Sequence, residues 1–169
     1  MTDQTPVPME RMGRCAKLAW EHAVEEWRGA SEERRRPGVM TGHILLGVLQ
    51  EPTCAGGLIL RKIGLDLQLV IDHTRFALVY GRRRDGIVEP TVVGWDVPHT
   101  PTVLKVIKLC EEEANLTSAT FPIGTEHLTL ALLRAETGMA NRVLQHFGIS
   151  ENQARVARDA WWDVLKLAE

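Results

Sequence analysis

The residue of this sequence best placed to do chemistry is Glu126, in the stretch "GTEH" at 124–127. An apolar helical pattern begins at Thr125, so Glu126 falls in the first turn of a predicted helix. The first N–H groups of a helix lack partners, and the positive end of the helix dipole lies there. A carboxylate at such a place stays ionised and can accept charge-assisted hydrogen bonds. The simpler interpretation is that Glu126 only complements the dipole, which is worth about 0.3–1 kcal/mol.

The sequence of the helix that contains Glu126 occurs in a second, similar copy earlier in the chain. Residues 41–64 align with 125–148 at an offset of 84 without a gap, and the apolar positions keep their phase. Upstream, "CAKLAWEHA" at 15–23 aligns with "VIKLCEEEA" at 106–114 at an offset of 91, which gives the first copy seven extra residues in a polar loop. A repeat of this kind indicates one unit that cannot bury its apolar face alone. The identical pairs at offset 84 are Thr41/Thr125, His43/His127, Leu46/Leu130, Leu49/Leu133, Thr53/Thr137, Leu60/Leu144 and Gly64/Gly148.

Each copy predicts four helices, the second of which begins at Thr41 or Thr125 with the threonine as its N-cap. No stretch alternates with period two over a useful length; 87–95 comes closest but contains proline and glycine. We therefore predict an all-α fold class with about eight helices in a single domain, 1–169, built from two four-helix repeats related by a pseudo-twofold axis. The predicted segments are repeat one at about 9–80, a linker at 81–99 and repeat two at about 100–168.

Composition and motifs exclude several classes of function. The net charge of −2 gives no electrostatic reason to expect nucleic acid or an anionic membrane as partner. No apolar run approaches ~18 residues and the first residues lack a signal-peptide core, so we expect a cytoplasmic protein with no membrane contact. No HxxxH or HExxH pattern occurs, and we expect neither a metal nor another cofactor. The phosphate loop GxxxxGK[ST] is also missing, which excludes an ATP-driven motor within this chain.

The three cysteines and two repeated histidines are expected to be structural. Cys15, Cys54 and Cys110 are an odd number with no CxxC pair, and Cys15 and Cys110 fall among apolar residues of helical stretches. The sequence therefore favours both as buried free thiols that act as small hydrophobic residues. His43 and His127 lie on the same face of matching helices, and we expect each to be buried and satisfied by a backbone carbonyl.

Two further groups of residues have competing interpretations. The run 111–113, "EEE", is expected to be a solvated helix face rather than a pair of catalytic carboxylates. Trp161 and Trp162 are adjacent on a helix and so point about 100° apart, which predicts that one is exposed as an anchor for a partner protein. The alternative is that the tryptophans fill a groove between the repeats.

Taken together, these motifs resemble the Clp N-terminal domain, the double-repeat module at the front of ClpC- and ClpA-type AAA+ unfoldases. The resemblance covers about residues 9–168 and is carried by "GTEHLTLALLRAETGMANRVLQHFGIS" in the second copy. The first copy contributes "TGHILLGVLQE" and "GGLILRKIGLDL", and the helix upstream of the second copy reads "HTPTVLKVIKLCEEEA". The ATPase modules of those unfoldases have no counterpart in these residues.

The resemblance implies a binding module that does no chemistry of its own. In the family it docks adaptors and substrates, and in ClpC-type members it receives phosphoarginine at the glutamate of each GTEH. This implies ligand-binding residues Glu126, Thr125 and Thr100. The family's arginine after "TP" is replaced by Thr102. In the first copy Gly42 replaces the glutamate and Met9 stands opposite Thr100 at offset 91, so we expect one ligand site rather than two.

Three hypotheses for the function follow. The first is a non-enzymatic, stand-alone Clp N-domain-like protein that binds peptides, adaptors or arginine-phosphorylated proteins and regulates or feeds a Clp protease. Its partners would be Clp ATPase or peptidase components together with adaptor or substrate proteins. The second is a structural accessory subunit that docks on the Clp peptidase or motor ring, with Trp161 or Trp162 in the contact. The third, an enzyme or ligand sensor on a helical scaffold, has no motif in its favour.

Overall fold

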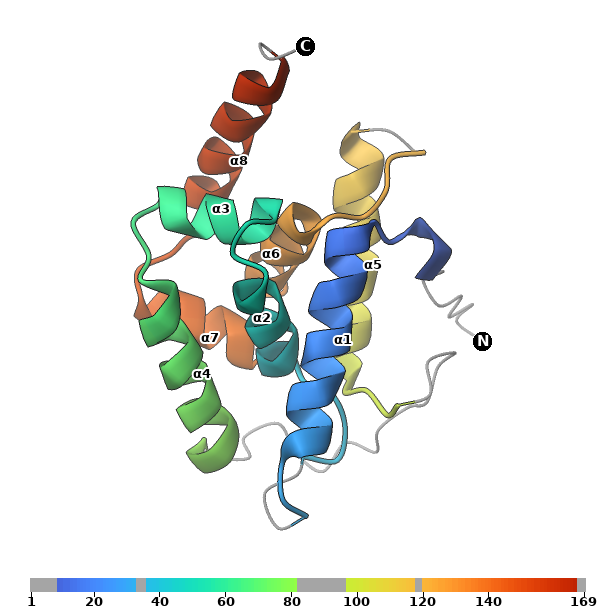
Figure 1. The fold of residues 1–169 in the computed structure, drawn as a ribbon, viewed down its shortest axis with the longest axis vertical. Helices are drawn as coiled ribbons and strands as arrows, with labels where there is room; N and C mark the ends of the chain where they lie inside the picture. Colours follow the sequence, from blue (N-terminus) through green and yellow to red (C-terminus); the bar gives the residue numbers. More distant parts are fainter. Residues whose placement is uncertain (1–8, 33–35, 82–96, 118–119, 167–169) are drawn as a thin grey trace.

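The computed structural model describes residues 9–32, 36–81, 97–117 and 120–166, and the side chains of these residues up to position 163. Over these ranges the chain forms one short 3₁₀ helix and eight α-helices with no strand, which confirms the all-α prediction (Figure 1). The strand candidate at 87–95 and most of the predicted linker 81–99 lie outside the described residues. The elements are η1 (Met9–Arg11), α1 (Arg14–Gly29), α2 (Thr41–Gln50), α3 (Ala55–Lys62), α4 (Leu67–Tyr80), α5 (Pro101–Thr117), α6 (Thr125–Arg134), α7 (Met139–His146) and α8 (Glu151–Lys166).

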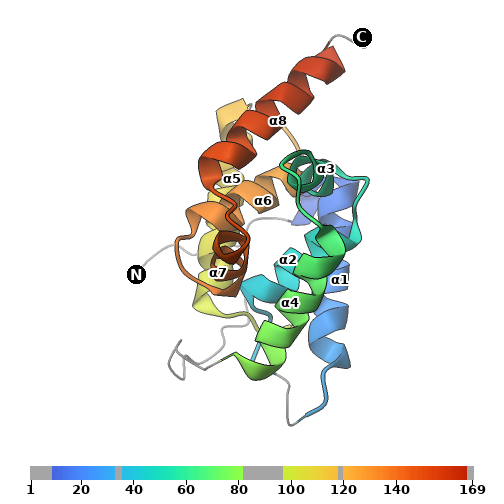
Figure 2. The ribbon, with the colours of Figure 1, turned by 90° about the vertical axis from the view of Figure 1, so that its left-hand side faces the viewer.

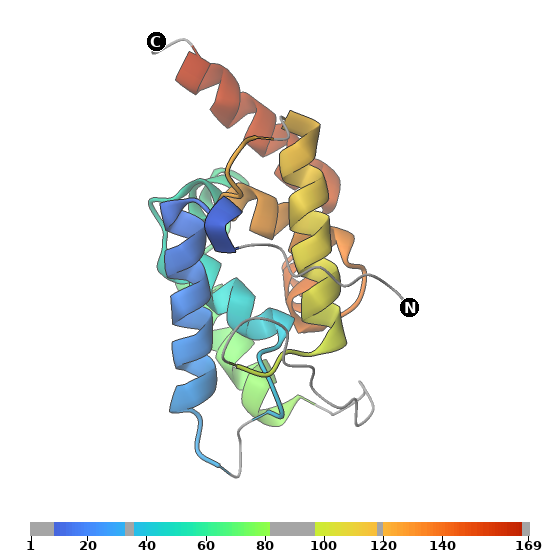
Figure 3. The same cartoon turned by 90° about the vertical axis from the view of Figure 1, so that its right-hand side faces the viewer.

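The two groups of four helices interlock instead of sitting side by side. Helix α4 packs on α2 of its own repeat and on α7 of the other, while α8 packs on α6 of its own repeat and on α3 of the other. Figure 2 shows α4 beside α7, and Figure 3 shows α1 and α5 flanking α2 and α6. This exchange of neighbours is the contact pattern that a pseudo-twofold axis between the repeats produces. Each repeat therefore completes the hydrophobic core of the other.

Two short parallel contacts fix how the repeats align. Met12 pairs with Ile123, and Val39 pairs with His99. Val39 and Ile123 are 84 apart, as predicted, but Met12 and His99 are 87 apart. The predicted offset of 91 for the first helix is therefore wrong by four residues, and the first copy holds three extra residues rather than seven. Four residues are about one helical turn, so the shift preserves the apolar phase and periodicity could not reveal it.

The central helices α2 and α6 are buried on every side because neighbouring helices of both repeats cover them. All residues of α2 from Thr41 to Leu49 are buried. Helix α1 approaches α2 so closely that a Cβ at Gly47 would collide with the carbonyl oxygen of Ala19. Among the described residues no single helix combines the length and apolar character needed to cross a membrane; α2 and α3 satisfy that test only as a pair bent by 88°.

The repeated threonines bind across the repeats. Helices α2 and α6 begin at Thr41 and Thr125, each one residue after its N-cap, so the prediction of threonine N-caps is wrong. Instead, the Thr125 Oγ1 accepts the Gly56 N–H of α3 at 2.9 Å, and the Thr41 Oγ1 accepts the Ala140 N–H of α7 at 3.2 Å. Gly56 and Ala140 are themselves 84 apart and lie in the first turns of their helices. Each threonine thus satisfies a free N–H group at the start of a helix in the other repeat.

Candidate ligand-binding site at the start of α6

Glu126 is the second residue of α6 and is only 6% exposed. Its carboxylate folds back over the preceding Gly124, where an added Cβ would overlap both carboxylate oxygens. A larger residue at this N-cap would therefore push the Glu126 side chain out of its present position. Burial raises the pKa of Glu126, and the opposing effects of its own backbone N–H and of the Arg158 charge are smaller. The helix start therefore holds a carboxylate whose negative charge is incompletely compensated.

The neighbouring histidine closes the first turn of the helix. The His127 Nδ1 accepts the Gly124 N–H at 2.9 Å, and the His43 Nδ1 accepts the Met40 N–H at 2.9 Å. The partner is thus a backbone N–H in both repeats, and not the backbone carbonyl that the sequence led us to expect. Burial lowers the pKa of each histidine to about 4, so both are neutral at pH 7. The approach of Glu126 Oε1 to His127 Nδ1, at 3.3 Å, is therefore not an ion pair, because that nitrogen carries no proton.

Aromatic and basic side chains surround this helix start. The Phe121 ring centre lies 6.1 Å from that of His127 and 5.1 Å from that of Trp162 on α8. One turn before Trp162 on the same helix is Arg158, whose charge acts on Glu126. Trp161 and Trp162 are both half-buried. The structure therefore brings the predicted partner-binding residue Trp162 to the same end of the molecule as the predicted ligand-binding glutamate.

The two threonines predicted for the site, Thr125 and Thr100, do not place a free hydroxyl beside the Glu126 carboxylate. Thr125 is fully buried, and its hydroxyl supports Gly56 as described above. Thr100 donates its N–H to the Val39 carbonyl at 3.1 Å, which places it beside the start of α2. Helix α5 then runs about 25 Å away from this point before the chain returns to α6. Thr100 therefore lies at the end of the molecule where Gly42 stands.

The structural alignment also shows that the residue of repeat one equivalent to Thr100 differs from the one predicted. Gly13 donates its N–H to the Ile123 carbonyl at 2.9 Å, which matches the contact of Thr100 with Val39. The equivalent of Thr100 is thus Gly13, 87 residues earlier, and not Met9. One end of the molecule keeps the glutamate without the threonine, and the other keeps the threonine without the glutamate.

At the α2 start, other side chains occupy the space that a glutamate at position 42 would need. A Cβ at Gly42 would lie 2.8 Å from the Met139 Sδ and 3.2 Å from the Leu78 Cδ2. Met139 belongs to α7, and its counterpart in α3, at offset 84, is the small residue Ala55. A large side chain from the other repeat therefore covers Gly42.

The sequence analysis missed a buried carboxylate next to this site. Glu113 is 0% exposed, so the expectation of a solvated face at 111–113 is wrong for this residue. Its carboxylate accepts hydrogen bonds from Arg134 at 2.6 Å and from Arg155 at 2.7 and 2.9 Å, and Arg158 lies 3.6 Å away. Burial alone would raise the pKa of Glu113, but Arg155 and Arg134 outweigh it and lower the pKa. Helical periodicity could have predicted this burial, because Cys110, one turn earlier on α5, is buried and lies on the same face of the helix as Glu113.

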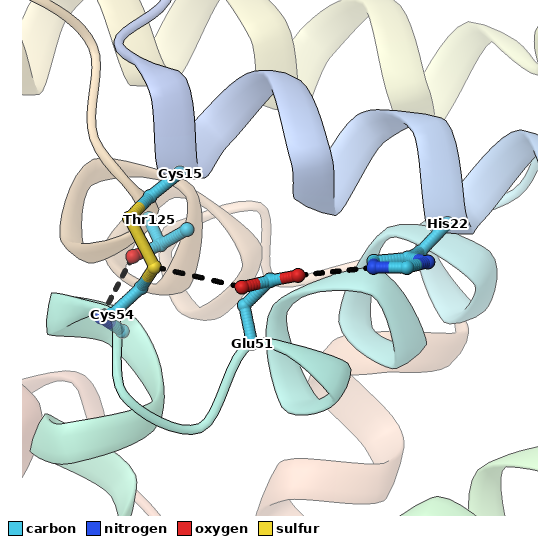
Figure 4. Close-up of a disulfide and its surroundings, with 6 residues drawn as sticks. Cys15, His22, Glu51, Cys54 and Thr125 are labelled. Atoms are coloured by element: carbon cyan, nitrogen blue, oxygen red, sulfur yellow. Dashed lines mark hydrogen bonds and ion pairs between the residues drawn. A yellow bond between two sulfur atoms is a disulfide. The ribbon is translucent and has the colours of Figure 1, made fainter.

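A disulfide was also missed. Cys15 and Cys54 are bonded, with their Cα atoms 6.1 Å apart, so the prediction of Cys15 as a buried free thiol is wrong (Figure 4). Cys110 is buried and free, as predicted. The odd number of cysteines concealed a pair 39 residues apart, because sequence alone does not show that α1 and α3 meet. Among the described residues no group of three or more His, Cys, Asp or Glu side chains is arranged to hold a metal ion.

Comparison with known proteins defines the class to which this fold belongs. Residues 100–165 match the family described as "Clp repeat (R) N-terminal domain". The N-terminal domain of the caseinolytic protease-associated chaperone ClpD from Arabidopsis thaliana has a similar fold, with a TM-score of 0.69 at 20% identity, and the match covers 93% of this chain and 97% of that one.

Curated relatives extend the similarity over most of the chain. The chaperone protein ClpB of Oceanobacillus iheyensis is 32% identical over 129 residues, which are 75% of this chain and 15% of that protein. The chloroplastic chaperone protein ClpC of Pisum sativum is 33% identical over 138 residues, or 80% of this chain and 14% of that protein. This chain therefore belongs to the Clp N-terminal domain family, and it spans about 15% of the length of these relatives.

Proposed function

We propose that this domain binds peptides, adaptors or arginine-phosphorylated proteins and thereby regulates or feeds a Clp protease in the cytoplasm. Its partners would be Clp ATPase or peptidase components, and it would have no catalytic activity of its own. The observation that carries the proposal is Glu126, a buried carboxylate at a helix start with its charge incompletely compensated. The relatives named above are chaperones of the Clp type, which agrees with a role in handling protein clients.

The chemistry around Glu126 suits a guest that carries both signs of charge. A guanidinium placed against Glu126 would compensate the carboxylate and form charge-assisted hydrogen bonds. The aromatic faces of Phe121 and Trp162 are suited to stack on such a planar cation. Arg158, whose charge already acts on Glu126, is the nearby cation for a phosphate on the same guest. A phosphorylated arginine combines these two groups in one side chain.

The histidine of the site supports a binding role rather than catalysis. The Nδ1 of His127 is occupied by the Gly124 N–H, and the ring is buried against Phe121. A general base needs a free nitrogen within reach of the substrate. His127 is used instead to complete the first turn of α6.

The test is a calorimetric titration with a phosphoarginyl peptide and its unphosphorylated arginyl counterpart. We expect one molar equivalent of the phosphorylated peptide to bind. Glu126→Gln should weaken binding at least ~10-fold, because it removes the charge but keeps the shape; this corresponds to about 1.4 kcal/mol. Glu112→Gln, on the exposed face of α5, is the matched control and should bind as the wild type does. Equal affinity of the wild type and the Glu126→Gln variant would refute the proposed site.

A second candidate, a structural accessory subunit that docks on the Clp peptidase or motor ring, is supported by α8. Figures 1 and 2 show the C-terminal half of α8 extending beyond the other helices. Trp161 lies on this part of α8 and is half-buried, and tryptophan is a frequent anchor in protein interfaces. In a binding assay with purified peptidase rings, this function predicts stable binding that Trp161→Ala weakens and Glu126→Gln leaves unchanged.

A further inference from the structure

We propose that Cys15 and Cys54 form a reversible thiol–disulfide exchange site that controls the order of the α6 start. The substrate class is a small or protein dithiol, which reduces the bond, and the corresponding disulfide, which restores it. The exchange itself is independent of the function proposed above. Its effect on ligand affinity rests on that function, because it acts on the same helix start.

The fold brings the two sulfur atoms together without help from the bond. Cys15 lies in the first turn of α1, and Cys54 is the N-cap of α3. At the matching positions repeat two has Thr102, 87 residues after Cys15, and Gly138, 84 residues after Cys54. A Cβ built on Gly138 lies 3.0 Å from the Thr102 Cγ2, so these positions touch with no covalent link. The thiols of a reduced protein would therefore stay adjacent and could rejoin.

Acid–base groups stand beside the bond, as Figure 4 shows. Glu51 Oε2 lies 3.8 Å from the Cys54 Sγ, and Glu51 Oε1 lies 3.0 Å from the His22 Nε2. In the disulfide the sulfur has no proton, so the sulfur–carboxylate contact is not a hydrogen bond. After reduction the Cys54 S–H acquires Glu51 as an acceptor, and His22 holds that carboxylate in place. The reduced state thus has a ready hydrogen-bond arrangement.

The exchange balances as a two-electron transfer. A thiolate of the external dithiol attacks the sulfur of Cys15, the more exposed residue of the pair: Cys15 is half-buried and Cys54 is buried. The Cys15–Cys54 bond breaks, a mixed disulfide forms, and the Cys54 thiolate takes up a proton. The second thiol of the reductant then displaces Cys15, which also takes up a proton. The dithiol leaves as a disulfide, and the protein gains two thiols.

The third cysteine does not take part. Cys110 is fully buried in α5. Burial, together with the negative charge of Glu113, raises the pKa of Cys110 well above its usual range. Exchange needs a thiolate that can reach the disulfide. Cys110 therefore remains a thiol in both states.

One hydrogen bond connects the exchange site to the ligand end. Gly56, two residues after Cys54, donates its N–H to the Thr125 Oγ1, and Thr125 immediately precedes Glu126. The disulfide anchors the first turn of α3 to α1 and so holds this hydrogen bond in place. Opening the bond removes this covalent tether, so the turn, which still packs against α1, opens more often and supports the α6 start less firmly. In a reducing compartment the ligand end would follow the redox state.

The test compares the oxidised and reduced forms of the folded protein. Alkylation after unfolding should count one free thiol in the oxidised form and three after treatment with dithiothreitol, and reoxidation should restore one. Amide hydrogen exchange at Gly56 and Glu126 should be about tenfold faster in the reduced form. The Cys15→Ser variant should exchange at the fast rate with or without dithiothreitol, and Cys110→Ser should behave as the wild type. The phosphoarginyl peptide should bind several-fold more weakly to the reduced form.

Two outcomes would overturn the proposal: three thiols in the folded protein under oxidising conditions, or full reduction with exchange at Gly56 and Glu126 unchanged. The exchange measurement needs no ligand. A redox-dependent exchange rate in a protein that does not bind the peptide would therefore support the exchange site and reject only the proposed ligand.

Discussion

Glu26 in repeat one and Glu113 in repeat two occupy equivalent positions, 87 residues apart, yet they sit in different surroundings. Glu26 is bonded to Gln50 at 2.7 Å and to the exposed Arg75, and its side chain is 21% exposed. Glu113 is fully buried and has Arg134 where Glu26 has Gln50. Burial of a carboxylate is costly without strong partners, and the depth of these two carboxylates matches the number of arginines around each.

The starts of α2 and α6 differ in a complementary manner. At the α6 start Glu126 is present, and the α3 residue that corresponds to Met139 is the small Ala55. At the α2 start the glutamate is Gly42, and Met139 fills the space. The duplication therefore preserved the helices and their contacts while only one end kept its carboxylate.

The largest expected difference between the repeats concerns the disulfide. Removing it with Cys15→Ser and Cys54→Ser should lower the free energy of unfolding by about 4 kcal/mol, because the bond closes a loop of 39 residues. The matched change in repeat two, Thr102→Ser, should cost less than about 1 kcal/mol. Urea unfolding of the oxidised proteins measures both. Equal losses would mean that the bond adds nothing to the contact that both repeats share.

The next largest effect separates the two carboxylates. Glu113→Gln should lower the free energy of unfolding by about 2 kcal/mol, because it removes the buried charge that Arg134 and Arg155 share and leaves each arginine only a more exposed carboxylate, Glu112 or Glu151. Glu26→Gln, at the equivalent but partly exposed position, should cost about 1 kcal/mol or less. Thermal and urea unfolding at neutral pH would compare them. Similar losses would contradict the link between depth and pairing.

A smaller effect should be common to both repeats. His43 and His127 have folded pKa values of about 4, below the unfolded value of 6.5. Between these values the unfolded chain binds more protons, so the free energy of unfolding falls as the pH drops through this range. At pH 5.5 each histidine should cost about 1 kcal/mol. Replacing His127 by glutamine should remove about half of this pH dependence, and the matched change His43→Gln should remove a similar part. An unchanged pH dependence of the free energy of unfolding in the His127→Gln variant would contradict the role that the two histidines share.

Sequence periodicity could predict the eight helices and the all-α fold because apolar phase is a local property. It could not fix the alignment of α1 with α5, since a slip of one turn leaves that phase intact. It also could not show that Cys15 meets Cys54, or that Thr125 bonds to Gly56, because these contacts join different helices. Glu126 could be identified from a local pattern. Thr100 was assigned to the wrong end of the molecule because its neighbour, Val39, belongs to the other repeat.

The account depends most on the claim that a guest binds at the α6 start and not at the α2 start. Titration of the phosphoarginyl peptide into isotopically labelled protein, followed by NMR, tests this directly. The amides of Gly124, Glu126 and His127 and the indole of Trp162 should shift to saturation at one molar equivalent, while Gly42 and His43 remain unchanged. Equal shifts at both helix starts, or shifts at Gly42 alone, would contradict the account.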